Sequence, residues 1–261
     1  MKYEQLVYNV SGDESKLYCY EHTEFPEMPV ESRPAMLVIP GGGYGMCSDR
    51  EGEPVAIEFF NRGYNAYVLR YPVAPARFPS QLIAAANAMN EIRSRAKGCK
   101  TNVKKVFAIG FSAGGHLCGS LANCPEDFAP VKKYDFAPDG IVLCYPVIGG
   151  TPTHGGSFDN LLGGMPEGEN EWLNLHASVR EDNPPAFIWA TANDACVPAV
   201  NALNYAAAYC AKGLKYELHI FRDGPHGLSV CDERTAYGNP CLINGKAAHW
   251  IDFADEFLRS I

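Results

Sequence analysis

A serine between two glycines is the first feature of this sequence that could carry chemistry. Residues 110–114 read Gly-Phe-Ser-Ala-Gly and match the pattern G-x-S-x-G. The apolar run VFAI precedes them, and the small residues AGGHLCGSLA continue from them. A strand, a sharp turn and a helix in this order form a nucleophile elbow, which presents a serine hydroxyl for attack. We therefore expect Ser112 to be a nucleophile; the alternative is a glycine-rich turn with an incidental serine.

A serine hydroxyl is a weak nucleophile, so Ser112 needs a neighbouring base. His226 lies in the turn Arg-Asp-Gly-Pro-His-Gly just after the last predicted strand, and it is the base we expect. Behind such an elbow the chain order is serine, acid, histidine, which excludes His22. His116 lies one turn beyond Ser112 and is expected to pack in the core. The other histidines are less well placed: His154 and His176 in a long loop, His219 within a strand and His249 on the last helix.

The acid that orients the histidine should follow the penultimate strand. Asp194 does so, in the polar turn Thr-Ala-Asn-Asp-Ala-Cys between an apolar strand and a helix start. Such an acid holds the imidazole in the correct tautomer and stabilises the imidazolium. The rival is Asp223, which lies three residues before His226 and is expected to shape that turn. Asp182 and Asp159 lie in the long loop and are interpreted as solvated or capping residues.

A run of three glycines, Gly41 to Gly43, follows the apolar run AMLVI and Pro40. Consecutive glycines let the backbone turn its N–H groups toward a developing oxyanion, where one donor is typically worth about 2.7–4 kcal/mol. We expect Gly42 or Gly43 to supply one donor and the amide of Ala113 to supply the other. The alternative is a flexible turn. A phosphate-binding loop is excluded because no G-K-[ST] follows, and the dinucleotide fingerprint is not matched.

Composition narrows the class of protein. The 261 residues carry a net charge of -8, which argues against nucleic acid or an anionic membrane as a partner. No apolar run is long enough to span a membrane, and no secretory signal is expected in the opening MKYEQLVYNVSGDESKLY. The ten cysteines are scattered and are expected to be reduced, mostly buried thiols of a cytoplasmic protein. No histidine or cysteine cluster has metal-ligand spacing, so we expect no metal. Attack by a serine activated by a histidine needs no organic cofactor, so none is expected.

Apolar runs of strand length alternate with stretches of helical period, which is typical of an α/β protein with a mostly parallel sheet. The predicted strands cover residues 3–8, 16–20, 35–39, 64–70, 104–109, 140–145, 186–191 and 216–221. The predicted helices cover residues 54–61, 81–97, 113–122, 200–212 and 245–259. No linker or repeat is apparent, so residues 1–261 are expected to form one domain. The Gly- and Pro-rich stretch 147–185 is expected to be a long loop or small lid within it.

Taken together, these segments resemble the esterase/lipase superfamily of α/β-hydrolases, and in particular small bacterial acetyl-xylan-esterase-like or feruloyl-esterase-like carboxylesterases. The resemblance covers roughly residues 34 to 258 and rests on PGGGYGMCSDREGEPVAIEFFNRGYNAYVLRYPVAP, IGFSAGGHL, NDACVP and GPHG. It implies an eight-stranded sheet with helices on both faces and no large N-terminal cap. It also implies a Ser112, Asp194, His226 triad with Gly42, Gly43 and Ala113 around the oxyanion. Related lipases carry a histidine where this chain has Pro40.

The resemblance further implies hydrolysis of a carboxylic ester through an acyl-enzyme. A short acyl group, such as acetyl on a sugar, is our expectation for this small-molecule substrate. Tyr44, Phe158 and Trp172 could form an aromatic floor for a sugar or aryl group, and packing in the core or lid is the alternative for each. An arylformamidase- or peptidase-like amide hydrolase and a non-catalytic ligand-binding relative are the alternative functions, and homo-oligomerisation is left open.

Overall fold

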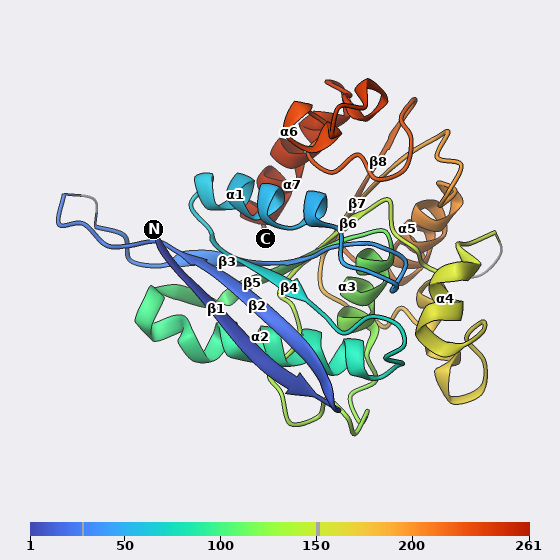
Figure 1. Ribbon diagram of the computed structural model, residues 1–261, viewed down its shortest axis with the longest axis horizontal. Coiled ribbons are helices and arrows are strands. Elements are labelled where there is room, and N and C mark those ends of the chain that lie inside the picture. Colours follow the sequence, from blue (N-terminus) through green and yellow to red (C-terminus); the bar gives the residue numbers. More distant parts are fainter. Residues whose placement is uncertain (28, 150–151) are drawn as a thin grey trace.

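The eight segments predicted as strands all lie in one sheet of the computed structural model, which describes residues 1–27, 29–149 and 152–261 (Figure 1). The strand order is β1-β2-β4-β3-β5-β6-β7-β8. The hairpin β1–β2 joins β4 antiparallel, and all pairs from β4 to β8 are parallel. The strands are β1 (Lys2–Val10), β2 (Asp13–Glu21), β3 (Arg33–Ile39), β4 (Asn65–Arg70), β5 (Thr101–Phe111), β6 (Ile141–Cys144), β7 (Ala186–Thr191) and β8 (Tyr216–Phe221).

Helices cover both faces of this sheet, so β6 and β7 are buried along their length and β5 is buried from Val106 onward. Helices α1 (Glu53–Asn61) and α7 (Trp250–Arg259) lie on one face, and α2 (Ser80–Cys99) lies on the other (Figure 1). Helix α3 (Ala113–Asn123) packs against α2, and the Tyr205 hydroxyl of α5 (Val200–Lys212) donates to the Asn123 side chain of α3. Continuous apolar strands suit this burial on both faces. The predicted mostly parallel eight-stranded sheet with helices on both faces is confirmed (Figure 1).

The helix predictions differ from the structure mainly at helix ends and in the stretch 147–185. Helix α7 begins at Trp250 rather than at Gly245, because residues 247–249 form the 3-10 turn η5 (Ala247–His249). The stretch predicted as a long loop contains α4 (Gly155–Leu162), η2 (Gly168–Leu173) and η3 (Leu175–Ala177). Buried Phe158 and Leu161, three residues apart, give α4 an apolar face that the surrounding glycines conceal in the sequence. The remaining short elements are η1 (Asp49–Glu51), α6 (Glu233–Ala236) and η4 (Pro240–Leu242).

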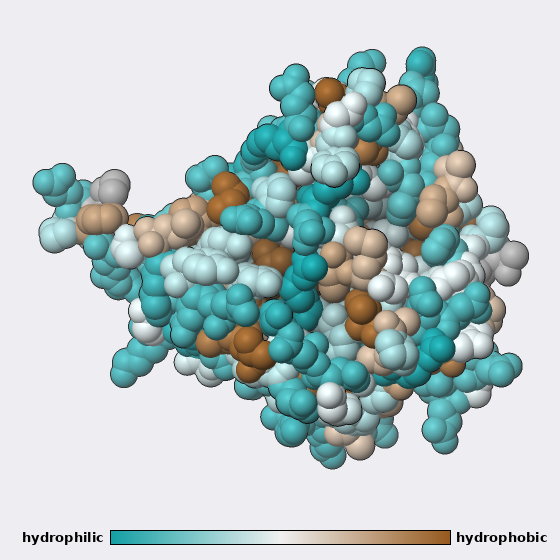
Figure 2. Space-filling model, viewed as in Figure 1, coloured by the Kyte–Doolittle hydropathy of each residue, from teal (hydrophilic) through white to brown (hydrophobic). Residues whose placement is uncertain are grey.

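The face of the molecule shown in Figure 2 is mainly polar. Hydrophilic residues cover most of the face shown in Figure 2, and hydrophobic residues appear on it as small separated patches. Within the described residues, no helix is both long enough and apolar enough to cross a membrane. All ten cysteines belong to the described part of the chain, where each is free and seven are buried.

Candidate active site

Ser112 occupies a strained turn between β5 and α3. Its backbone angles are φ 54° and ψ -120°, a conformation that residues other than glycine rarely adopt. The flanking glycines allow the turn because no Cβ fits beside them. A Cβ on Gly110 would lie 2.2 Å from the Gly114 carbonyl oxygen, and one on Gly114 would lie 2.2 Å from the Ile39 carbonyl oxygen. The G-x-S-x-G pattern therefore has a steric cause at both of its glycines.

Three side chains predicted from different parts of the sequence meet at this turn. His226 Nε2 lies 2.8 Å from Ser112 Oγ, and His226 Nδ1 lies 2.6 Å from Asp194 Oδ2. The other carboxylate oxygen of Asp194 accepts hydrogen bonds from the amides of Cys196 and Val197, at 2.8 and 2.9 Å. These amides fix the buried carboxylate in one orientation. A neutral His226 that donates from Nδ1 to Asp194 leaves Nε2 free to accept the serine proton.

The two loops that carry Asp194 and His226 are tied to each other. They follow the parallel neighbours β7 and β8, whose carboxyl ends lie at the same edge of the sheet. The Thr191 hydroxyl donates to the Gly224 carbonyl at 2.7 Å, and the Gly224 amide donates to the Asn193 side chain at 2.8 Å. These two bonds hold the histidine turn beside the aspartate turn.

The rival acids lie in other surroundings. Asp223 lies in the same turn as His226 but forms an exposed ion pair with Arg222. The imidazole of His226 bonds to Asp194 instead. Asp182 pairs with Arg180 at the surface. Asp159 is an exposed residue of α4. Among the candidate aspartates, the structure thus brings Asp194 to the histidine.

The glycine loop after β3 lies directly against the nucleophile. A Cβ on Gly41 would lie 2.9 Å from the Cβ of Ser112. The Gly41 amide donates to the buried carboxylate of Glu51 at 2.9 Å, so it is not available for a substrate oxygen. Gly42 and Gly43 have φ angles of 124° and 61°, which favour glycine. This arrangement leaves Gly42 and Gly43 as the candidate oxyanion donors of the loop.

The second predicted donor is the amide of Ala113. Ala113 is the first residue of α3, and the first N–H groups of a helix have no acceptor within the helix. This amide also lies at the positive end of the helix dipole, which favours a developing negative charge. The roles of Ala113 and of either loop glycine stay predictions.

His116 and Tyr44 form a buried pair behind the glycine loop. The Tyr44 hydroxyl lies 2.8 Å from His116 Nδ1, and His116 Nε2 lies 2.8 Å from the Leu173 carbonyl oxygen. A carbonyl oxygen only accepts, so Nε2 carries the ring proton and Nδ1 accepts from Tyr44. Complete burial lowers the pKa of His116 to about 4. The expected core packing of His116 is found, and its bond to the residue after Gly43 could not be inferred from the sequence.

This neutral histidine predicts how stability depends on pH. The unfolded chain protonates His116 near pH 6.5, whereas the folded protein keeps it neutral down to about pH 4. The unfolded state therefore binds the extra proton as the pH falls, and the free energy of unfolding decreases between pH 6.5 and 4. The contribution of this one group is about 3 kcal/mol.

Urea unfolding at several pH values between 7 and 4 measures this effect. A His116→Gln variant is the matched control, because an amide can make both hydrogen bonds but does not titrate. The free energy of unfolding should fall less steeply with acid in that variant than in the wild type. Identical pH profiles for the two proteins would contradict the assignment.

The aromatic residues predicted as a substrate floor are packed in the protein. Tyr44 and Phe158 are buried, with 1% and 0% of their surface exposed. Trp172 is half-buried, and its ring packs against Phe78 and Phe128 at centroid distances of 6.0 and 5.7 Å. The structure therefore favours the alternative of core or lid packing. Phe158 points inward from α4 and Trp172 from η2, and neither short element was expected from the sequence.

The described part of stretch 147–185 borders the glycine loop. The Asn160 side chain donates to the Gly43 carbonyl at 2.9 Å, and a Cβ on Gly43 would lie 3.7 Å from His154 Cε1. His154 is thus one of the side chains nearest to the candidate oxyanion donors. Residues 150 and 151 of the predicted lid lie outside the described residues, and a lid function stays a prediction.

A buried carboxylate that the sequence analysis missed joins both sides of the site. Glu51 accepts from the Gly41 amide and, at 2.7 Å, from the Tyr145 hydroxyl. The Tyr145 oxygen accepts from the Ser229 amide at 2.9 Å, and its ring packs edge-on against His226 with centroids 5.0 Å apart. Glu51 lies in DREGEPVA, where its only sequence signal was its place near the glycine run.

Comparison with known proteins finds relatives of this chain. A family model described as BD-FAE matches residues 24–137. The chain is 38% identical over 231 residues to endo-1,4-beta-xylanase B of Butyrivibrio fibrisolvens, covering 83% of this chain and 35% of that protein. It is 28% identical over 233 residues to an acetylxylan esterase of Xylanibacter ruminicola, covering 86% of this chain and 46% of that protein. The chain thus spans less than half the length of these curated relatives.

Solved structures cover the chain more completely. The α/β-hydrolase enzyme MGS-M1, from a Medee basin deep-sea metagenome library, is 31% identical with a TM-score of 0.82, covering 100% of this chain and 97% of that one. An acetyl ester-xyloside bifunctional hydrolase from Caldicellulosiruptor lactoaceticus is 32% identical with a TM-score of 0.81, covering 94% and 88%. The chain belongs to the α/β-hydrolase family. The predicted resemblance to its esterases is confirmed.

Proposed function

We propose that this protein is a serine esterase that removes short acyl groups, acetyl foremost, from xylose-containing sugars. The observation that carries the proposal is the unbroken hydrogen-bonded series from Asp194 through His226 to Ser112, at 2.6 and 2.8 Å. An oriented acid, a base and a hydroxyl nucleophile in this series suit acyl transfer.

The proposed reaction has two halves. Ser112 Oγ attacks the ester carbonyl carbon while its proton passes to His226 Nε2, and the carbonyl oxygen becomes an oxyanion held by amides of the glycine loop and Ala113. The intermediate collapses, the bond to the sugar oxygen breaks, and His226 returns the proton to the leaving alcohol. Water gives one proton to His226 and attacks the acyl-serine, and the bond to Ser112 Oγ breaks to release the carboxylic acid, which then ionises in solution. His226⁺ returns its proton to Ser112 Oγ, which restores the enzyme.

The proposed substrate class is supported by the names of the relatives and by two side chains that lie beside the glycine loop. One relative is named an acetylxylan esterase, another a xylanase, and a solved structure an acetyl ester-xyloside hydrolase. On the enzyme side, Asn160 of the 147–185 stretch donates to the Gly43 carbonyl, and a Cβ on Gly43 would be in van der Waals contact with His154. Side chains this near to the candidate oxyanion donors favour a small acyl group.

A substrate panel tests this proposal on one purified sample. We expect kcat/KM to be highest for acetylated xylose and xylo-oligosaccharides, lower for butyryl and longer p-nitrophenyl esters, and lowest for aryl formamides. A rate that climbs from acetate to long-chain esters would contradict the short-acyl assignment, and preference for the formamides would favour an amide hydrolase instead.

The cellular location that fits this function best is the cytoplasm. Ten free cysteines, seven of them buried, suit a reducing compartment, where thiols persist. We therefore propose that the substrates are small acetylated oligosaccharides that enter the cell.

A further inference from the structure

One face of the antiparallel corner of the sheet carries three neighbouring tyrosines. Tyr3 of β1 lies opposite Tyr20 of β2, and Tyr18 of β2 lies opposite Val68 of β4. Side chains two residues apart on a strand share a face, so all three tyrosines point to the same side. Tyr3 keeps 54% of its surface exposed, and its ring lies 5.4 Å from that of Tyr20 between centroids. Tyr18 is half-buried and Tyr20 is buried, with 5% of its surface exposed, so Tyr3 and Tyr18 carry the accessible aromatic surface of this face.

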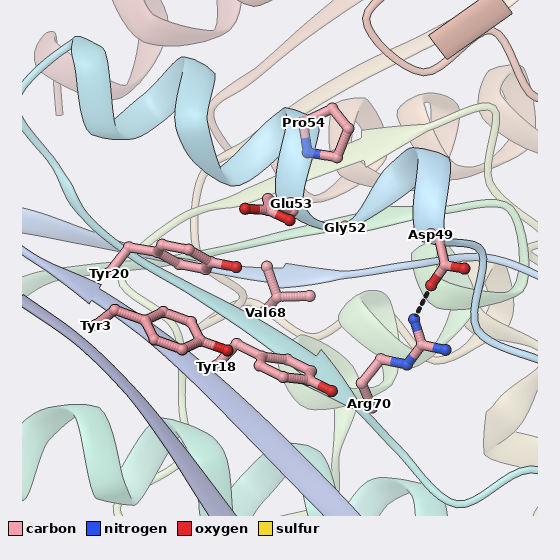
Figure 3. Close-up of a pocket in the computed structure, with 9 residues that line it drawn as sticks. All are labelled: Tyr3, Tyr18, Tyr20, Asp49, Gly52, Glu53, Pro54, Val68 and Arg70. Carbon is pink, nitrogen blue, oxygen red and sulfur yellow. Dashed lines mark hydrogen bonds and ion pairs between the residues drawn. The ribbon is translucent and has the colours of Figure 1, made fainter. Parts of the chain in front are cut away.

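The start of α1 turns this face into a groove. The tyrosines form its floor, and η1 with the first residues of α1 forms its wall (Figure 3). Glu53 projects from this wall toward Tyr20, and Arg70 at the far end pairs with Asp49. The cavity measures about 390 Å³, within the range of small-molecule sites. We call this cavity, with Tyr3, Tyr18, Tyr20, Asp49, Glu53 and Arg70, the tyrosine groove.

The tyrosine groove leads toward the candidate active site. A second cavity, of about 470 Å³, shares Tyr18, Asp49 and Arg70 with it and extends to Gly45 and Met46. These two residues belong to the same loop as the candidate oxyanion donors, because the amides of both donate to the Gly42 carbonyl at 3.0 and 3.1 Å. The two cavities are thus neighbours between the edge hairpin and the glycine loop, with the Arg70–Asp49 pair at their common boundary.

We propose that the tyrosine groove binds unesterified sugar residues of the chain whose ester is cleaved at Ser112. This inference rests on the proposed function and extends it from the acetyl group to the oligosaccharide. Tyrosine rings offer flat faces to the C–H surfaces of a sugar ring and hydroxyls to its oxygens. Glu53 and the Arg70–Asp49 pair offer acceptors and donors for neighbouring sugar hydroxyls.

The charge of the groove selects the class of sugar. Two carboxylates, Glu53 and Asp49, face one guanidinium, Arg70, which is already paired. A carboxylated polysaccharide would meet repulsion here, whereas a neutral chain such as a xylo-oligosaccharide would not. The hydroxyl groups of the three tyrosines point toward the Arg70 end of the groove (Figure 3). The occupant we infer is therefore a neutral, extended oligosaccharide.

Binding is tested without turnover by titrating unesterified xylohexaose into the Ser112→Ala protein in a calorimeter. We expect saturable binding that is much weaker for xylose, and a loss of about tenfold in affinity when Tyr18→Ala is added, as expected for one truncated aromatic contact. Tyr18→Phe should retain most of the affinity because it keeps the ring. Tyr237→Ala, which removes a tyrosine with 94% of its surface exposed outside the groove, is the matched control and should not change it.

Turnover gives an independent measurement on the active enzyme. The ratio of kcat/KM for acetylated xylohexaose to that for acetylated xylose should fall about tenfold in Tyr18→Ala and in Tyr3→Ala. Tyr3→Ala covers the case in which Tyr18→Ala does not fold, because the Tyr3 side chain is half exposed.

The outcomes separate this inference from the proposed function. Equal xylohexaose affinity with and without Tyr18, or an unchanged ratio in both variants, overturns the groove assignment while ester hydrolysis stands. A wild type that cleaves no ester overturns the proposed function, and Tyr18-dependent binding of xylohexaose would still support the groove. A dimer that Tyr3→Ala dissociates in sedimentation, without xylohexaose binding, would show that a second copy occupies this face and overturn the inference.

Discussion

The Ser112→Ala variant is expected to lose on the order of 10⁶-fold in kcat for p-nitrophenyl acetate. The substitution removes the atom that attacks the carbonyl and leaves His226 with no proton to accept from it. The residual rate should reflect the oxyanion donors and substrate binding, which act without the nucleophile. Steady-state kinetics measure the loss, and active-site titration checks that traces of wild-type enzyme do not account for the remaining rate.

Two further observations make this result specific to the nucleophile. A fluorophosphonate probe should label the wild type at Ser112 and leave the variant unlabelled, whereas a non-catalytic binding protein would react in neither form. Ser94→Ala, at an exposed serine of α2, is the matched control and should keep wild-type rates. Undiminished turnover by Ser112→Ala, with an unchanged melting temperature, would remove the assignment.

Replacing Asp194 by Asn should cost about 10⁴-fold in kcat although the side chain keeps its shape. The amides of Cys196 and Val197 donate to Oδ1, so the oxygen of the new amide must take that place. Its NH₂ group then faces His226 Nδ1, which can only accept from it. The ring proton moves to Nε2, and the imidazole can no longer accept the proton of Ser112.

This reversed tautomer distinguishes positioning from simple destabilisation. The wild type and the Asp194→Asn variant should have similar free energies of unfolding. Nitrogen-15 NMR of His226 should show the ring proton on Nδ1 in the wild type and on Nε2 in the variant. Asp223→Asn is the matched control near the same histidine and should retain most of the activity. Loss of less than tenfold in Asp194→Asn would point to another acid.

How much of the site was predictable depended on how local its signal is. Ser112 stands in a contiguous motif whose glycines have a steric cause, so the sequence alone was enough to place Ser112 at a strained turn between a strand and a helix. Asp194 and His226 were predictable because parallel strands end at one edge, which brings turns that follow different strands together. Their hydrogen bonds are geometric findings, since no rule of spacing gives a distance.

Features that depend on tertiary packing were out of reach of sequence reasoning. Glu51 and Tyr145 are 94 positions apart, and neither carries a periodic or motif signal that would pair them. The same holds for Tyr44 and His116, which are 72 positions apart. The inward orientation of Phe158 depended on α4, whose short apolar face is hidden among glycines. The fold itself was predictable because strand length, alternation and buried runs are local properties.

The hydrogen bonds around Glu51 have a consequence for anyone who wishes to change the specificity of this protein by exchanging loops. The glycine loop is anchored on Glu51, and Glu51 is anchored through Tyr145 on Ser229, three residues beyond His226. A glycine loop transplanted from another hydrolase would arrive without its matching anchor and leave a buried carboxylate short of a donor. The glycine loop and the segments that carry Glu51, Tyr145 and Ser229 should therefore be exchanged together or not at all.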